Sequence, residues 1–132
     1  MSKQIKVALI GNPNTGKTSI FNSLTGLSQK IANYPGVTVE KKEGICKLNR
    51  GTKAHIFDLP GTYSLNASSM DENLVVELLL NKNHKDFPDL AIIVSDVENL
   101  KRNLVLFTQV KDLEIPTILA INMSDRMKYK GI

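Results

Sequence analysis

The sequence predicts an α/β fold in which helices cover a mostly parallel sheet with one antiparallel strand. Three observations predict it. Short apolar runs alternate along the chain with segments of helical periodicity. The run at 90–95 is a short continuous apolar stretch, which is typical of a central parallel strand. Residues 37–49 and 53–58 flank a turn and indicate an antiparallel hairpin.

The length of the chain suits one domain, which we place at residues 1–132. Hydrophobic residues make up 42% of it, enough to fill a core. The single cysteine, Cys46, excludes a disulfide within the chain and fits a reducing compartment. The N-terminus lacks the apolar region of a signal peptide, and no apolar stretch is long enough to cross a bilayer. We therefore expect a cytoplasmic domain.

The most informative stretch is 11–18, which reads Gly-Asn-Pro-Asn-Thr-Gly-Lys-Thr. It follows a strand predicted over 4–10 and opens a helix predicted over 16–25, which Gly26 ends. Strand, glycine-bounded loop and helix are the context of a phosphate-binding P-loop. A chance glycine turn before a helix is the alternative interpretation.

The residue types in this stretch suit a triphosphate. Backbone N–H groups and a helix N-terminus attract phosphate, and glycines at 11 and 16 let the backbone approach it closely. Lys17 supplies an ammonium that can reach the outer phosphates. Thr18 supplies a hydroxyl oxygen, a hard ligand suited to Mg²⁺.

The remaining elements alternate between strands and helices. Because the connections between parallel strands are helices, we expect helices on both faces of the sheet. After the first helix we expect, in order, a loop over 27–36, strands over 37–49 and 53–58, a polar loop, a helix over 70–81, a strand over 90–95, a helix over 100–112 and a strand over 117–121.

Three polar motifs follow three of the parallel strands. They are the stretch 11–18, Asp58-Leu59-Pro60-Gly61, and Asn122-Met123-Ser124-Asp125. In open α/β sheets the ligand lies at the carboxyl ends of the strands. We therefore expect the three motifs to converge on one edge of the sheet.

Asp58 ends an apolar strand, where an unpaired carboxylate would be costly. A Mg²⁺ shell, reached directly or through water, gives this carboxylate a partner. Gly61 can turn its backbone N–H toward the terminal phosphate. The alternative is a simple strand-ending turn, since Asp, Pro and Gly are all turn residues.

Asn122 and Asp125 lie three residues apart after a buried strand. A carboxylate there can accept the two N–H groups that guanine offers and adenine does not. Asp125 can also cap the next helix. In the loop before the hairpin, the Thr38 hydroxyl could close over Mg²⁺, although Thr15, Thr25 and Ser28 compete for that role.

The first half of the chain is basic, with nine Lys/Arg against three Asp/Glu in residues 1–66. Nucleic acid is disfavoured as a partner because there is no arginine-rich helix and no series of stacking aromatics. Five of the basic residues are interpreted as a solvated face of the hairpin, and His55 as a packed or solvated side chain. These five are Lys41, Lys42, Lys47, Arg50 and Lys53.

The order of the motifs GNPNTGKTS, Thr38, DLPG and NMSD resembles that of small GTPases of the translation-factor-related kind. Longer stretches resemble the N-terminal G domain of the bacterial ferrous iron transport protein B family. These stretches are KTSIFNSLTG, NYPGVTVEKKEG, DLPGTYSL, SDVENLKRNLVLFTQ and IPTILAINMSDRMKYKGI, and they extend over nearly the whole chain.

The resemblance implies a three-layer P-loop NTPase fold of the Ras-like kind, with switch loops at about 27–38 and 59–69. It implies that the chain binds GTP with Mg²⁺ and hydrolyses it slowly to GDP, in the service of ferrous iron uptake. The implied nucleotide-binding residues are Gly11, Asn12, Pro13, Asn14, Thr15, Gly16, Lys17, Thr18, Ser19, Asp58, Gly61, Asn122, Met123 and Asp125.

Within this set the resemblance implies narrower roles. Thr18, Thr38 and Asp58 would hold Mg²⁺, and Asn14 would hold K⁺ beside the phosphates. Lys17, Asn14 and Gly61 would be the catalytic residues. The cation would neutralise the charge that develops during phosphoryl transfer, as an arginine finger does elsewhere.

Two positions depart from Ras-like enzymes. Thr62 occupies the place of the water-positioning glutamine, and Met123 replaces the lysine common in the guanine motif, as is usual in this family. Both differences fit weak intrinsic hydrolysis. The missing glutamine keeps a signalling module with negligible turnover open as an alternative function. A P-loop ATPase is a third interpretation.

The family pattern also sets expectations for partners. It continues through a sixth strand and a last helix that we expect this chain to lack, which would leave strand 117–121 as a bare edge that could pair with another chain. The resemblance further implies a helical regulatory domain and a membrane permease as partners, at the cytoplasmic face of the bacterial inner membrane.

Overall fold

The sheet has six strands among the residues that the computed structural model describes, which are 3–11, 16–26, 29–34, 39–60, 70–98 and 100–122. Three α-helices and a single 3₁₀ turn accompany it in these ranges. The elements in chain order are β1 Lys3–Gly11, α1 Lys17–Thr25, β2 Lys30–Asn33, β3 Glu40–Lys47, η1 Asn49–Gly51, β4 Thr52–Asp58, α2 Met70–Leu80, β5 Leu90–Asp96, α3 Leu100–Lys111 and β6 Thr117–Asn122.

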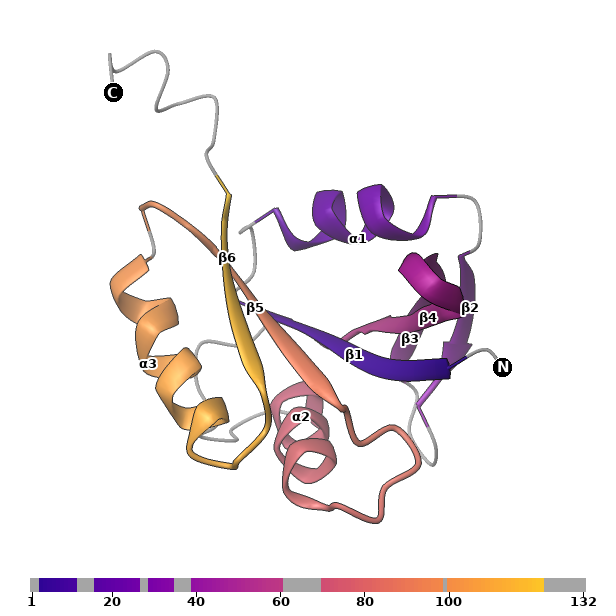
Figure 1. Cartoon of the computed structure of the whole chain (residues 1–132). Coiled ribbons are helices and arrows are strands. Elements are labelled where there is room, and N and C mark those ends of the chain that lie inside the picture. Colours follow the sequence, from indigo (N-terminus) through magenta and orange to yellow (C-terminus); the bar gives the residue numbers. More distant parts are fainter. Residues whose placement is uncertain are drawn as a thin grey trace, which may run out of the picture.

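The strand order is β2-β3-β4-β1-β5-β6 (Figure 1). Strands β4, β1, β5 and β6 pair in parallel, whereas β3 pairs antiparallel with both β2 and β4. Strand β3 is therefore the one strand that runs against the others. This arrangement confirms the predicted mostly parallel sheet with one antiparallel strand.

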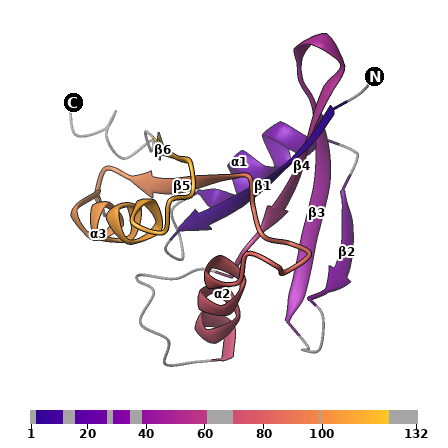
Figure 2. The same ribbon diagram turned by 60° about the horizontal axis from the view of Figure 1, so that its bottom comes forward.

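The helices lie on both faces of this sheet (Figures 1 and 2). Phe21 of α1 packs against Val7, Leu9 and Ile56 on one face. On the other face α2 and α3 pack against β1, β4 and β5. That second core contains Ala8, Ile10, Tyr34, Phe57, Leu59, Leu74, Val75, Leu78, Leu79, Ala91, Ile93, Leu106, Val110 and Ile115. The alternate residues of β1 thus face opposite layers, which is the three-layer arrangement expected.

Strand β2 is the element that the sequence analysis missed, because residues 27–36 were predicted to be a loop. All four residues of β2 are exposed, Ile31 at 65%. A strand buried on neither face shows no alternation of apolar and polar residues, so the sequence carries no sign of it. Backbone pairing with β3, in the register Lys30↔Glu43 to Asn33↔Glu40, creates it.

The solvated face predicted for the hairpin is wrong for Lys41, which is only 6% exposed. Its ammonium lies 2.7 Å from Asp86 Oδ1 and 3.1 Å from Glu43 Oε2. Glu43 Oε2 also lies 3.1 Å from His55 Nε2. We call Lys41, Glu43, His55 and Asp86 the Lys41 cluster. It joins β3 and β4 to the segment between α2 and β5, and a buried lysine becomes tolerable because two carboxylates surround it.

The charges in this cluster perturb Glu43. Burial alone would raise the pKa of the Glu43 carboxyl, but the hydrogen bond and the charge of Lys41, together with Lys30 and His55, hold this pKa below its usual value. Glu43 therefore stays ionised at neutral pH. Lys30, the outer partner, is 76% exposed and lies 3.3 Å from Glu43 Oε1.

Candidate nucleotide-binding site

The carboxyl ends of three parallel strands meet at one edge of the sheet. The register aligns Leu9 of β1 with Asp58 of β4, and Gly11 of β1 with Val94 of β5. It also aligns Asp96 of β5 with Asn122 of β6. The starts of the three polar motifs, at residues 11, 58 and 122, therefore share one edge, as the sequence analysis predicted.

Helix α1 begins at this edge. Gly16 precedes the helix with φ 85°, a left-handed conformation that residues with a Cβ rarely adopt. The first turn of the helix has no acidic side chain, and Gly16 supplies no side-chain cap. Thr18 and Ser19 lie in that first turn and are exposed. The N-terminus of α1 is the positive end of the helix dipole, and no carboxylate in the first turn of this helix neutralises it.

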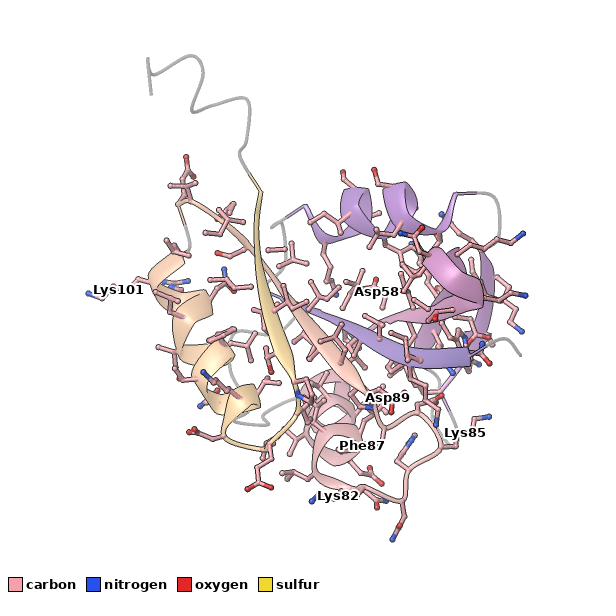
Figure 3. The ribbon with its side chains drawn as sticks, viewed as in Figure 1. Asp58, Lys82, Lys85, Phe87, Asp89 and Lys101 are labelled. Carbon is pink, nitrogen blue, oxygen red and sulfur yellow. The ribbon has the colours of Figure 1, made fainter. Side chains whose placement is uncertain are left out.

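Lys17 and Asp58 form an ion pair at the same edge, with 2.8 Å between Lys17 Nζ and Asp58 Oδ1. The Lys17 ammonium also donates a hydrogen bond to the carbonyl of Leu59. Both side chains are largely covered, with exposed fractions of 10% and 19%. In Figure 3 Asp58 lies within the outline of the molecule, whereas Lys82, Lys85 and Lys101 project from its periphery. The two predicted phosphate and metal residues are therefore brought together.

Asp58 is suited to a metal ion. Its Oδ1 is buried and, among the described residues, has the ionic contact with Lys17 Nζ but no hydrogen-bond partner. Mg²⁺ takes one or two protein carboxylates and leaves its other positions to water and phosphate. No group of three or more His, Cys, Asp or Glu side chains in the described ranges is arranged to hold a metal ion. Asp58 with the Thr18 hydroxyl fits the sparse protein ligation that Mg²⁺ uses.

Several predicted site residues lie outside the described residues. They are Asn12, Pro13, Asn14 and Thr15 of the P-loop, Thr38 and Gly61 of the loops, and Met123 and Asp125 of the last motif. The backbone of Asn122 is described as the end of β6. The proposed roles of these residues stay predictions.

Tyr34 is a residue at this site that the sequence analysis did not single out. It is 1% exposed, and its hydroxyl donates a hydrogen bond of 2.9 Å to the carbonyl of Asp58. Burial, reinforced by the carboxylates of Asp58, Asp86 and Glu43, raises the pKa of the Tyr34 hydroxyl, so it stays a donor. The sequence held one sign of this role, an aromatic residue inside a polar, turn-like stretch. If such a tyrosine is buried, its hydroxyl needs a hydrogen-bond partner.

Comparison with known proteins gives a consistent result. The family model described as "Ferrous iron transport protein B" matches residues 5–132. A fusion protein of Fe(2+) transport protein A and Fe(2+) transporter FeoB from Porphyromonas gingivalis is 47% identical over 127 residues. That match covers 96% of this chain but only 15% of the relative, so the chain spans a small part of the length of its curated relative.

Solved structures agree with the fold. The G domain of the T. maritima FeoB iron transporter matches with a TM-score of 0.85 at 46% identity, covering 95% of this chain and 76% of that one. The cytosolic domain of the same transporter in a GDP form matches with a TM-score of 0.86 at 46% identity, covering 99% of this chain and 49% of that one. The fold is thus that of a P-loop NTPase. None of the α-helices in the described part combines the length and apolar character needed to cross a membrane.

Proposed function

The chain belongs to the ferrous iron transport protein B family, and from this we propose that it binds GTP and hydrolyses it slowly to GDP. The hydrolysis would regulate ferrous iron uptake across the membrane. One observation carries the proposal: the Lys17–Asp58 pair lies at the sheet edge where α1 begins and β1, β4 and β6 end. A T. maritima relative solved in a GDP form supports guanine nucleotide as the ligand.

The pair can serve a Mg²⁺–nucleotide complex by exchanging partners. The Lys17 ammonium contacts a carboxylate and a carbonyl oxygen, and the outer phosphates offer it oxygens of higher charge. Asp58, released from Lys17, would then hold Mg²⁺ directly or through water, together with Thr18 and Thr38. Bound Mg²⁺ supplies neutralisation of the charge on the phosphate oxygens. Gly61 would offer its backbone N–H to the terminal phosphate.

The base is proposed to be guanine. Asp125 would accept the paired N–H donors of guanine, with Asn122 and Met123 beside it. The carboxyl end of β6 lies at the same edge as Asp58, which supports this placement of the base relative to the phosphates.

Hydrolysis is proposed to be intrinsically slow. Thr62 occupies the place where Ras-like enzymes carry a water-positioning glutamine. We propose that K⁺, held by Asn14, would neutralise the charge that develops during phosphoryl transfer, as an arginine finger does elsewhere. The same threonine favours a second function, a nucleotide-dependent signalling module whose output is loop ordering with negligible turnover.

The proposed partners are the helical regulatory domain and the membrane permease of the family protein. The chain would then work at the cytoplasmic face of the bacterial inner membrane. Strand β6 is an edge of the described sheet, and its Ile118 and Ile121 are 50% and 46% exposed. This edge supports pairing with another chain.

Single-turnover hydrolysis separates these functions. We expect GTP cleavage that is faster in KCl than in NaCl at equal ionic strength. Equal rates in the two salts would defeat the role of K⁺ and Asn14, and no cleavage in either would favour the signalling module. Asp125→Asn should weaken GTP binding and admit xanthine nucleotides, and binding of ATP as tight as GTP would instead assign an ATPase.

A further inference from the structure

Tyr34 is the largest by volume of the fully buried residues in the described part of the chain. Burying a phenol hydroxyl is costly unless it finds a partner. The partner is the main-chain carbonyl of Asp58, at 2.9 Å. The residue that follows β2 therefore donates a hydrogen bond to the backbone of Asp58, the residue whose carboxylate pairs with Lys17.

This bond fixes the peptide unit between Asp58 and Leu59 at both ends. The carbonyl of that unit accepts the Tyr34 hydroxyl. Its N–H, which belongs to Leu59, donates to the carbonyl of Leu9 on β1 at 3.0 Å. A peptide unit is planar, so two opposed hydrogen bonds hold its orientation. The Asp58 side chain precedes this unit and the Leu59 carbonyl, which accepts from Lys17, follows it.

Tyr34 is itself held in place. Its backbone N–H donates to the carbonyl of Val39 at 3.0 Å. The ammonium of Lys41 lies 5.7 Å from the centroid of its ring, within the range of a cation–π contact. Asp86 and Glu43 pair with the same ammonium. The hydroxyl is thus carried by a ring that cannot shift without disturbing the Lys41 cluster.

We propose that Tyr34 is a positioning residue for Asp58, acting through the Asp58 carbonyl to hold the carboxylate and its Lys17 contact in the geometry that a Mg²⁺–nucleotide complex needs. The inference rests on the proposed function, since it takes Asp58 as a metal ligand. It assigns β2, through the residue that follows it, a role in the site beyond pairing with β3. A tyrosine that only filled the core would need its ring but not its hydroxyl.

The test removes the hydroxyl and keeps the ring. Tyr34→Phe is compared with the unsubstituted 132-residue chain and with Thr117→Val as a matched control. Thr117 also donates a hydroxyl to a main-chain carbonyl, that of Ile115 at 2.7 Å, but at the amino end of β6. Binding of a fluorescent GTP analogue is measured over a Mg²⁺ titration, and binding of fluorescent GDP is measured in EDTA. The thermal stability of each variant is measured by thermal unfolding.

We expect Y34F to raise the Mg²⁺ concentration for half-maximal effect by about threefold to tenfold, the weight of one hydrogen bond. GDP affinity in EDTA should change by less than about twofold, because the P-loop contacts remain. T117V should leave the Mg²⁺ requirement unchanged. This split between a metal-dependent and a metal-independent readout is one that loss of packing alone does not produce.

Two results would overturn the inference. One is a Mg²⁺ requirement of Y34F equal to that of T117V. The other is a fall in affinity that is the same with and without Mg²⁺ and follows the loss of thermal stability, which would make Tyr34 a core residue only. Failure of the proposed function would look different, because the unsubstituted chain would then bind no guanine nucleotide. That result would also overturn the role inferred for Tyr34.

Discussion

Two lysine–carboxylate groups in this molecule share their chemistry but not their surroundings. Lys17 and Asp58 form one pair at the carboxyl edge of the parallel strands, and Lys17 has this single carboxylate partner among the described residues. Lys41 has two carboxylate partners, Glu43 and Asp86, and only 7% of its side chain is exposed. Each group contains one buried carboxylate oxygen without a hydrogen-bond partner in the described residues, Asp58 Oδ1 in the first and Asp86 Oδ2 in the second. The groups differ in place and in number of carboxylates: the first lies at the edge where α1 begins, and the second is enclosed between β3 and the segment before β5.

The difference indicates which group exchanges partners and which holds the structure together. A lysine with a single carboxylate partner, at the edge where a helix N-terminus attracts phosphate, can exchange that partner for a phosphate oxygen and leave the carboxylate to a metal ion. A buried lysine between two carboxylates has no better partner to gain. Removing it leaves the two carboxylates buried without its compensating charge. We therefore expect substitutions at Lys17 to change binding and substitutions at Lys41 to change stability.

The largest effect is expected from Lys41→Ala. Without the ammonium, Glu43 and Asp86 lie buried with no cation between them, and the free energy of unfolding should fall by about 3–5 kcal/mol. Urea unfolding of K41A and Lys47→Ala measures this. Lys47 lies on the same strand but is exposed, so K47A should stay within about 0.5 kcal/mol of the unsubstituted chain. Equal stabilities of the two variants would show that the cluster is not structural.

Lys17→Ala should have the next largest effect, and on binding. Loss of charged hydrogen bonds to phosphate is worth about 2–3 kcal/mol, which lowers the affinity for GTP by about 30-fold to 150-fold. Lys101→Ala, at an exposed lysine on α3, serves as the control. Nucleotide titration and urea unfolding are run on both variants. Tight GTP binding by K17A would show that the P-loop assignment is wrong.

Glu43→Gln tests the pH dependence of the Lys41 cluster. The pKa of Glu43 is lower in the folded chain than its usual value, so its ionised form adds stability above that value. This contribution is lost as the pH falls through the lowered folded-state pKa. We expect E43Q to cost about 1–2 kcal/mol at pH 7. Its unfolding free energy should also fall less steeply with acid, and an identical slope would contradict the account.

The smallest effect is expected from Lys30→Ala. Lys30 pairs with Glu43 but is 76% exposed, so solvent screens the pair. Its removal should cost less than about 0.5 kcal/mol in urea unfolding, although the carboxylate is the same one that Lys41 contacts. A loss comparable to that of K41A would mean that exposure does not separate structural from incidental ion pairs here.

Much of this fold could be predicted from the sequence, because its central strands are buried and its helices amphipathic. The run at 90–95 predicted β5 to within a residue, and the helical spacing at 70–81 predicted α2. Strand β2 was not predictable, since four exposed residues show no burial pattern and only pairing with β3 defines them.

The candidate site divides in the same way. Lys17 and Asp58 were predictable from the residues around them, because glycine, lysine and a strand-ending aspartate follow local patterns. The buried state of Lys41 depends on Asp86, which lies 45 residues away in the sequence. Tyr34 likewise depends on Asp58, 24 residues away. Local patterns hold no information on such partners, so the structure was needed to find them.

The most direct test of the proposed nucleotide site is a titration of fluorescent GDP into the 132-residue chain, with and without Mg²⁺. We predict saturable binding that unlabelled GTP and GDP displace and ATP does not, with GTP displacing better when Mg²⁺ is present. Absence of saturable binding, or displacement by ATP at the same concentration as GTP, would contradict the guanine-nucleotide function proposed for this edge of the sheet.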